Sequence, residues 1–226
     1  MRSRTISIVG VTAIALAVAA TFTPGVSARS PDVGLTHKSS TASPAHSGNA
    51  RALPACHRQG ANDSANGVAS QNFEAANDVY DSRGADDFRL NTSCTTTIVK
   101  VNGQGSGAAT SMHVTFYRGK AGHPGLVISN QDNLAYADPS GTGNFTIPLP
   151  SSVTFAADKR YWVSVQANMD LASGQWFWNT NTVAKGLNAQ WRNPNNGFGT
   201  GCVTYTDLLT CVPSAGGPDF SFALLK

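Results

Sequence analysis

Residues 112–118 read MHVTFYR, and every second side chain, at Met112, Val114 and Phe116, is apolar. The same alternation returns near the carboxyl end, where residues 219–224 read DFSFAL. A period of two places successive side chains on opposite faces of a β-strand, so one face is buried and the other is solvated. Both stretches therefore predict β-strands of a sheet that buries one face.

Short β-rich runs of this kind recur from Gln71 onward, separated by clusters of Gly, Pro, Asn and Asp. The predicted strands are Asp86–Leu90, Thr95–Val101, Met112–Arg118, Leu126–Ser129, Asn144–Leu149, Arg160–Ala167, Gln175–Thr180, Asn188–Arg192, Val203–Tyr205 and Asp219–Leu225. A helical period of 3.6 is missing beyond the amino-terminal segment, so we expect few helices. The pattern predicts an all-β fold, namely an antiparallel β-sandwich, jelly-roll-like, with about ten short strands.

The composition excludes several classes of protein. Of the 226 residues 13% are charged, and the formal net charge is +3. A nucleic-acid-binding protein carries a larger excess of Lys and Arg, and a coiled coil carries more charges of both signs. We therefore expect a globular domain with no nucleic-acid partner.

The amino terminus has the pattern of a secretory signal peptide. Arg2 and Arg4 precede a charge-free apolar stretch, residues 6–20, and small residues lead to a predicted cleavage after Ala28. The apolar stretch is shorter than the roughly 20 residues of a membrane-spanning helix. The sequence thus predicts a signal peptide over 1–28, no membrane span after its cleavage, and a secreted protein, either extracellular or periplasmic.

Residues 29–69 are rich in Ser, Ala, Gly, Asn and Pro and lack an apolar period. This composition predicts a flexible linker. Its histidines, His37, His46 and His57, are too widely spaced for a preformed metal site. The β-sandwich domain is then expected over residues 70–226.

Four cysteines are an even number in a chain expected to enter an oxidising compartment. Three pairings are open. Because Cys202 and Cys211 bracket a short polar loop, we favour a bridge between them, which leaves Cys56 to pair with Cys94. A zinc site would need closer pairs of ligands, such as C-x-x-C.

Residues suited to catalysis are scarce. Glu74 is the one glutamate in the sequence, so a pair of glutamates for glycoside hydrolysis cannot form. The adjacent Asp86 and Asp87 would point to opposite faces of one strand. We expect His113 to be a solvated strand residue, and His123 lies in a Gly-His-Pro-Gly stretch typical of a turn. The sequence therefore predicts no catalytic residues.

Calcium is the one cofactor that the sequence suggests. Secreted sandwiches can bind this ion at strand ends through carboxylate and carbonyl oxygens. Asp86 and Asp219 lie near predicted strand ends and are the candidate ligands. The alternative is that these aspartates are solvated and form turns.

The positive indication of a ligand comes from four tryptophans within about thirty residues, Trp162, Trp176, Trp178 and Trp191. If residues 161–167 and 175–179 form an antiparallel hairpin, directly paired residues share a face. A register shift of one residue then decides whether Trp176 and Trp178 face the core or the solvent. Buried, they are core residues. Exposed, they form a flat platform for sugar rings, and the four tryptophans become the candidate ligand-binding residues.

Several runs of the sequence are also found together in a known kind of module: Gln71–Glu74, Ala85–Phe88, Val114–Tyr117, Gly122–Gly125, Tyr161–Val165, Trp191–Pro194, Gly197–Cys202 and Asp219–Phe222. Through these runs, residues 70–226 resemble a bacterial extracellular β-sandwich accessory module of uncharacterised function. The resemblance implies secretion and an accessory role, and it implies no catalytic residues.

We therefore expect a secreted, non-catalytic binding or surface-interaction module, with a polysaccharide or a cell-surface glycan as its ligand. Two other functions remain open. One is a secreted hydrolase or lyase that acts on an extracellular polymer through aspartates. The other is a structural or adhesive protein of the cell envelope.

Overall fold

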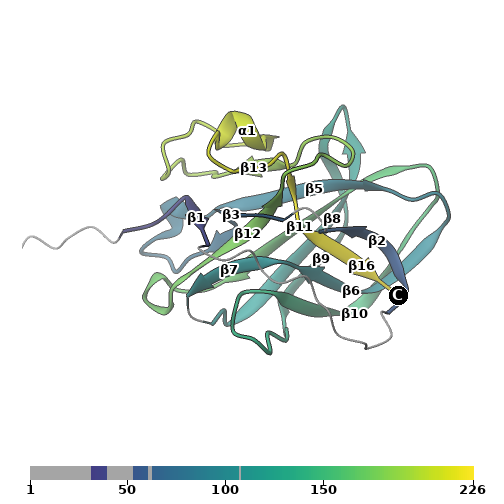
Figure 1. The fold of residues 1–226 in the computed structure, drawn as a ribbon, viewed down its shortest axis with the longest axis horizontal. Coiled ribbons are helices and arrows are strands. Elements are labelled where there is room, and N and C mark those ends of the chain that lie inside the picture. Colours follow the sequence, from purple (N-terminus) through teal and green to yellow (C-terminus); the bar gives the residue numbers. More distant parts are fainter. Residues whose placement is uncertain (1–31, 40–52, 61–62, 107) are drawn as a thin grey trace, which may run out of the picture. The chain divides into compact units, whose positions relative to one another are not determined.

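The computed structural model describes residues 32–39, 53–60, 63–106 and 108–226 (Figure 1). The predicted signal peptide, residues 1–28, lies outside the described residues. Within those residues, sixteen β-strands and one short α-helix are found, and the strands form three open sheets. No helix in the described ranges has the length and hydropathy needed to span a membrane.

The largest sheet has the strand order β14-β13-β5-β11-β8-β9, with β4 beside β11. All its pairings are antiparallel except that of β4 with β11. Its strands are β4 (Gln71–Asn72), β5 (Arg83–Arg89), β8 (Ser111–Lys120), β9 (His123–Leu134), β11 (Arg160–Asn168), β13 (Gln190–Arg192) and β14 (Thr206–Asp207).

Two smaller antiparallel sheets complete the fold. One has the order β10-β6-β16-β2, and the other has the order β1-β3-β12-β15 with β7 beside β12. Their strands are β1 (Thr36–Lys38), β2 (Ala55–Gln59), β3 (Asp63–Ala69), β6 (Cys94–Val101), β7 (Gly103–Ser106), β10 (Phe145–Phe155), β12 (Gln175–Asn181), β15 (Asp219–Phe220) and β16 (Phe222–Leu225).

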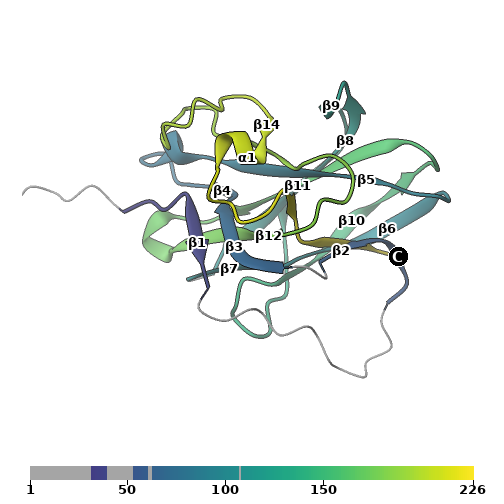
Figure 2. The same cartoon turned by 45° about the horizontal axis from the view of Figure 1, so that its top comes forward.

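The two smaller sheets form one layer, and the seven-stranded sheet packs against it (Figure 2). Backbone hydrogen bonds join the smaller sheets, since Asn179 N donates to Asn102 O and Ser221 N donates to Asn179 O. Across the interior, the ring of Phe88 on β5 meets that of Phe155 on β10, with centroids 5.0 Å apart. The predicted all-β class with antiparallel sheets is confirmed, with sixteen strands instead of about ten.

The predicted strand Val203–Tyr205 is wrong, whereas the other predicted ranges each overlap an observed strand. The chain pairs instead at Thr206–Asp207 and then enters helix α1 (Leu208–Cys211). The side chain of Asp207 accepts hydrogen bonds from Leu209 N and Thr210 N. This N-cap starts the helix and leaves only a two-residue strand before it.

The prediction that residues 29–69 form a flexible linker is wrong for the part that the structure describes. Strands β1, β2 and β3 lie in this range, β3 pairs with both β1 and β12, and β2 pairs with β16. Val68 on β3 is fully buried. Strand pairing uses backbone groups, which every residue except proline can supply in full, so a polar composition does not prevent it.

Both predicted disulfides are present, Cys56–Cys94 and Cys202–Cys211. The first joins β2 to the start of β6, and so ties the predicted linker to the sandwich. Two disulfides are typical of a protein in an oxidising compartment.

Candidate functional site

The tryptophans predicted to bind a ligand are all buried. At most 1% of each residue's surface is exposed in Trp162, Trp176, Trp178 and Trp191. Three of the indole N–H groups donate to backbone oxygens, those of Gly143, Ser221 and Ala69. The prediction of an exposed indole platform is therefore wrong.

The physical reason lies in strand pairing. Strands β11 and β12 do not form the hairpin on which the register argument depended. Strand β11 pairs with β5, β8 and β4, whereas β12 pairs with β3, β7 and β15. The short 3-10 helix Leu171–Ser173 carries the chain from one layer to the other. Trp176 and Trp178 then join the core between the layers, where Trp178 stacks on Phe220 with ring centroids 4.4 Å apart.

Trp162 lies on the outward face of the seven-stranded sheet, yet it is covered. It packs with Tyr117 and Ala85, and Tyr205 packs against this group. The hydroxyl of Tyr205 donates to Ser164 Oγ at 3.2 Å, which holds the tyrosine over the sheet. The indole Nε1 of Trp162 has no hydrogen-bond partner in the part of the chain that the structure describes.

Next to this aromatic group, the outward face of the same sheet is polar. Gln166 on β11 lies opposite His113 on β8, and its Oε1 accepts two hydrogen bonds from Arg83, at 2.6 and 3.2 Å. Asn168 lies opposite Ser111, and its Nδ2 donates to Ser111 Oγ at 2.8 Å. Because β11 pairs in continuous register with β5 and β8, polar side chains of these three strands lie in one row.

An open cleft of about 600 Å³ lies along this row, and we refer to it as the polar cleft. Its polar lining includes the side chains of Arg83, Ser111, His113, Asp132, Asn133 and Asn168. Both charge signs and neutral amides are present.

His113 is held from both sides of its ring. Its Nδ1 lies 2.5 Å from Asp132 Oδ1, and its Nε2 lies 2.7 Å from Asn130 Oδ1. The orientation of the Asn130 amide is set by its other end, because Nδ2 donates to Asp132 Oδ2 at 2.8 Å. Two facing oxygens suit a protonated ring. Burial nevertheless lowers the pKa of His113, and the Arg83 cation lowers it further, whereas Asn130 and Asp132 raise it.

The pair of His113 and Asp132 does not form a catalytic triad with a hydroxyl. Thr115 Oγ1 lies 3.0 Å from His113 Nε2, but Thr115 is only 2% exposed. Its hydroxyl is 2.7 Å from Asn130 Oδ1, to which it donates. A nucleophile must reach the substrate, so this arrangement is suited to binding and not to covalent catalysis. The sequence predicts a solvated His113, but only 16% of this side chain is exposed.

His123 takes no part in this cleft. It is the first residue of β9, and its Nδ1 lies 2.8 Å from Gln190 Oε1. The turn predicted at residues 122–125 is centred on Ala121 and Gly122, whose φ angles are +49° and +85°. Two positive φ angles between paired strands are typical of a two-residue hairpin turn.

The candidate calcium ligands Asp86 and Asp219 do lie together, although they are far apart along the chain. Gln59 Nε2 donates to Asp86 Oδ2 at 2.7 Å and to Asp219 Oδ2 at 3.1 Å. Both aspartates are fully buried. The amide therefore occupies the position between the two carboxylates that a cation would need.

This pair does not fit a calcium site for a second reason. In the described ranges, no group of three or more His, Cys, Asp or Glu side chains is arranged to hold a metal ion. Burial raises the pKa of Asp86 well above its usual range, and the nearby Asp219 adds to this effect. Burial also raises the pKa of Asp219 to about 6. The geometry therefore does not fit calcium at these residues, because the Gln59 amide donates to both carboxylates from the place where the ion would bind.

Comparison of the chain with protein-family models, with curated proteins and with solved structures finds no match. The resemblance to a bacterial extracellular module therefore stays a prediction. The structure itself shows an all-β protein with antiparallel sheets and two disulfides.

Proposed function

We propose that this protein is a secreted, non-catalytic binding module, and that its ligand is a hydroxyl-rich molecule, a saccharide chain, bound in the polar cleft. Two disulfides and the predicted signal peptide support the extracellular or periplasmic location. The tryptophans take no part in this proposal.

The single observation that carries the proposal is the set of fixed donors and acceptors along the cleft. A sugar hydroxyl both donates and accepts hydrogen bonds, so a site for it needs both kinds of partner. Arg83 and Asn168 supply donors, and Asp132 supplies an acceptor. A volume of about 600 Å³ lies in the range of small-molecule sites.

These groups are also held in place before any ligand binds. Two hydrogen bonds to Gln166 fix Arg83, and the contacts with Asp132 and Asn130 fix His113. Side chains that are already ordered lose less conformational entropy on binding. The cleft is therefore suited to a polar ligand even without an aromatic platform.

The test measures retention of the protein on insoluble polysaccharides and affinity for soluble ones. We expect Asp132→Asn combined with Asn168→Ala to weaken binding at least about tenfold, because hydrogen bonds to charged groups contribute roughly 1.5–3 kcal/mol. The matched control is Asp158→Asn, which changes an exposed aspartate that does not line the cleft. The melting temperatures of all variants are measured in parallel.

Equal retention of the double variant and the native protein would exclude the polar cleft as the site. Soluble product in the same incubations would show a hydrolase or lyase. Adhesion to cell envelopes without affinity for any glycan would show the structural or adhesive function.

A further inference from the structure

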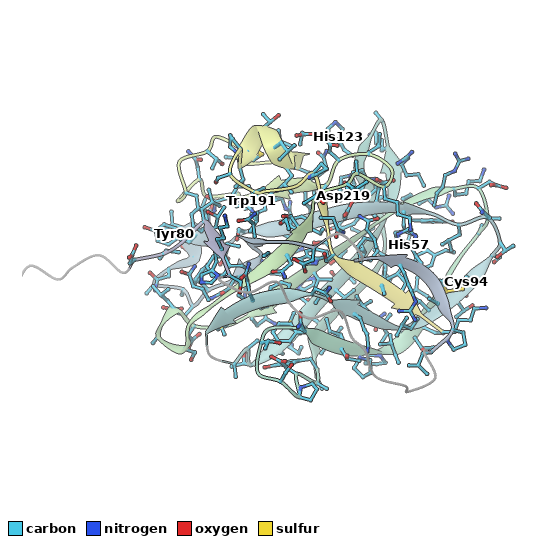
Figure 3. The ribbon with its side chains drawn as sticks, viewed as in Figure 1. His57, Tyr80, Cys94, His123, Trp191 and Asp219 are labelled. Atoms are coloured by element: carbon cyan, nitrogen blue, oxygen red, sulfur yellow. A yellow bond between two sulfur atoms is a disulfide. The ribbon has the colours of Figure 1, made fainter. Side chains whose placement is uncertain are left out.

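A second cavity, of about 490 Å³, lies beside the Cys56–Cys94 disulfide, and we refer to it as the basic cavity. Figure 3 labels His57 and Cys94, two of the residues that line it. Four cationic side chains line it, those of Arg58, Arg89, Lys185 and Lys226. Its lining, taken from the described residues, includes no aspartate or glutamate.

The four cations come from four separate parts of the chain. Arg58 lies on β2, Arg89 ends β5, Lys185 lies in the loop after β12, and Lys226 follows β16. All four residues are exposed. The pairing of β2 with β16 brings the segments of Arg58 and Lys226 together, and the hydrogen bond from Lys185 Nζ to Arg58 O joins the loop after β12 to them.

Three of these cations donate hydrogen bonds to backbone oxygens, which are neutral. Arg58 Nη2 donates to Leu53 O at 2.8 Å, and Lys185 Nζ donates to Arg58 O at 2.7 Å. Arg89 Nη2 donates to Asp158 O at 3.1 Å. A carbonyl orients a cation but leaves its charge unneutralised, so the positive charges add up around the cavity.

His57 lies in the wall of the basic cavity, close to these cations. Its ring stacks on Phe222, with centroids 5.2 Å apart, and it is enclosed in the wall of the cavity. Burial lowers the pKa of His57 to about 4, and the charge of Lys185 contributes to the lowering. The main cause is burial, the hydrogen bond to Gln59 raises the pKa in the opposite direction, and the Lys185 cation makes the smallest contribution.

The loop that carries Lys185 is fixed by the buried aspartates. Lys185 N donates to Asp219 Oδ2 at 2.5 Å, and Leu187 N donates to Asp87 Oδ1 at 2.7 Å. Gly186 lies between them with φ of +119°, and a Cβ there would be 2.6 Å from Asp87 Oδ1. The carboxylates thus act as positioning residues for Lys185, and the cavity is formed before a ligand arrives.

We propose that the basic cavity is an oxyanion site that takes a carboxylate, sulfate or phosphate group. Guanidinium and ammonium groups make charge-assisted hydrogen bonds to such groups, and Arg can do so in bidentate geometry. The oxyanion is either a free inorganic anion or the acidic group of a sugar. The site is separate from the polar cleft and does not depend on the saccharide function proposed for it.

The test is titration calorimetry at low ionic strength with four probes: inorganic sulfate, inorganic phosphate, glucuronate and glucose 6-phosphate. Neutral glucose is the control ligand. We expect Arg89→Gln combined with Lys185→Gln to reduce the affinity at least tenfold, since two of the four cations are lost. The affinity of the native protein is expected to fall as salt is raised.

Stronger binding of the acidic sugars than of the inorganic ions identifies a sugar as the source of the oxyanion, and stronger binding of the inorganic ions identifies a free anion.

The matched control variant is Arg118→Gln with Lys120→Gln, which removes two exposed cations that do not line the cavity. The proposal is overturned if the native protein binds none of the charged probes, if the control variant loses as much affinity as the test variant, or if glucose binds equally well. If the test variant has a lowered melting temperature, Lys226→Gln replaces it, because this exposed residue follows the last strand. Unchanged affinity in that variant would also overturn the proposal.

Discussion

The polar cleft and the basic cavity are built in opposite ways. The polar cleft lies along one sheet, where the register of β8 against β11 aligns residues such as His113 and Gln166. The basic cavity instead collects cations from four segments that are distant in sequence, such as Arg58 and Lys185. The first depends on strand register within one sheet, whereas the second depends on segments of different sheets, one of which is tied by the Cys56–Cys94 disulfide. Opening that disulfide should therefore affect only the second.

The largest effect is expected when the long-range link is removed. Cys56→Ser with Cys94→Ser opens a loop with a sequence separation of 38 residues. The chain-entropy model gives a loss of about 4 kcal/mol in the free energy of unfolding. Urea unfolding measures this loss. We also expect weaker oxyanion binding in the basic cavity, with saccharide binding in the polar cleft retained.

The matched control is Cys202→Ser with Cys211→Ser, whose sequence separation is 9 residues. The same model gives a smaller loss, about 3 kcal/mol. If the first double variant lost binding in both sites while still folded, the two sites would not be independent and the comparison would fail.

A middle-sized effect is expected from the carboxylate that anchors the Lys185 loop. The pKa of Asp219 is raised by burial from 3.8 to about 6 in the folded protein. Between these values the folded state binds more protons than the unfolded state, so the contribution of Asp219 to stability falls as pH rises from about 4 to about 6. Asp219→Asn removes this contribution. Relative to the native protein, the variant should gain roughly 1–3 kcal/mol between pH 4 and pH 7 in urea unfolding.

His57 supplies the opposite slope and serves as the control for that experiment. Its folded pKa of about 4 lies below the ordinary 6.5, so its contribution to stability is present above pH 6.5 and is lost as pH falls towards 4. His57→Gln should therefore lose stability relative to the native protein as pH rises over this range. Slopes of the same sign in the two variants would contradict at least one of the two assignments.

The smallest effect is expected at the β8–β9 turn, which lines neither site. Ala121 has a φ of +49°, a conformation that costs an L-residue roughly 1–2 kcal/mol and that Asn tolerates better. Ala121→Asn should raise the free energy of unfolding by up to about 1 kcal/mol, measured by thermal melting, and leave both affinities unchanged. Ala75→Asn, at an exposed position without a positive φ, is the control and should give no such gain.

Parts of the polar cleft could be predicted from the sequence. The alternation in MHVTFYR places His113 and Thr115 on one face, and the same alternation along β11 places Gln166 on a polar face. The pairing of the strands could not be predicted, because alternation indicates which face of a strand a residue occupies but not which strand lies beside it. For this reason the contacts of His113 with Asp132 and Asn130, across β8 and β9, could not be predicted.

The sequence by itself determined that the chain forms an all-β fold and that Asp86 and Asp87 face opposite ways, and it favoured the Cys202–Cys211 pairing, which the structure confirms together with Cys56–Cys94. Those properties follow from local period and from spacing. The tertiary structure alone decided that β11 and β12 enter different layers, which buries Trp176 and Trp178, and that Gln59 joins Asp86 to Asp219. Which strands pair depends on the total packing and hydrogen-bonding free energy of segments that are distant in sequence, and a short stretch of sequence does not contain this information.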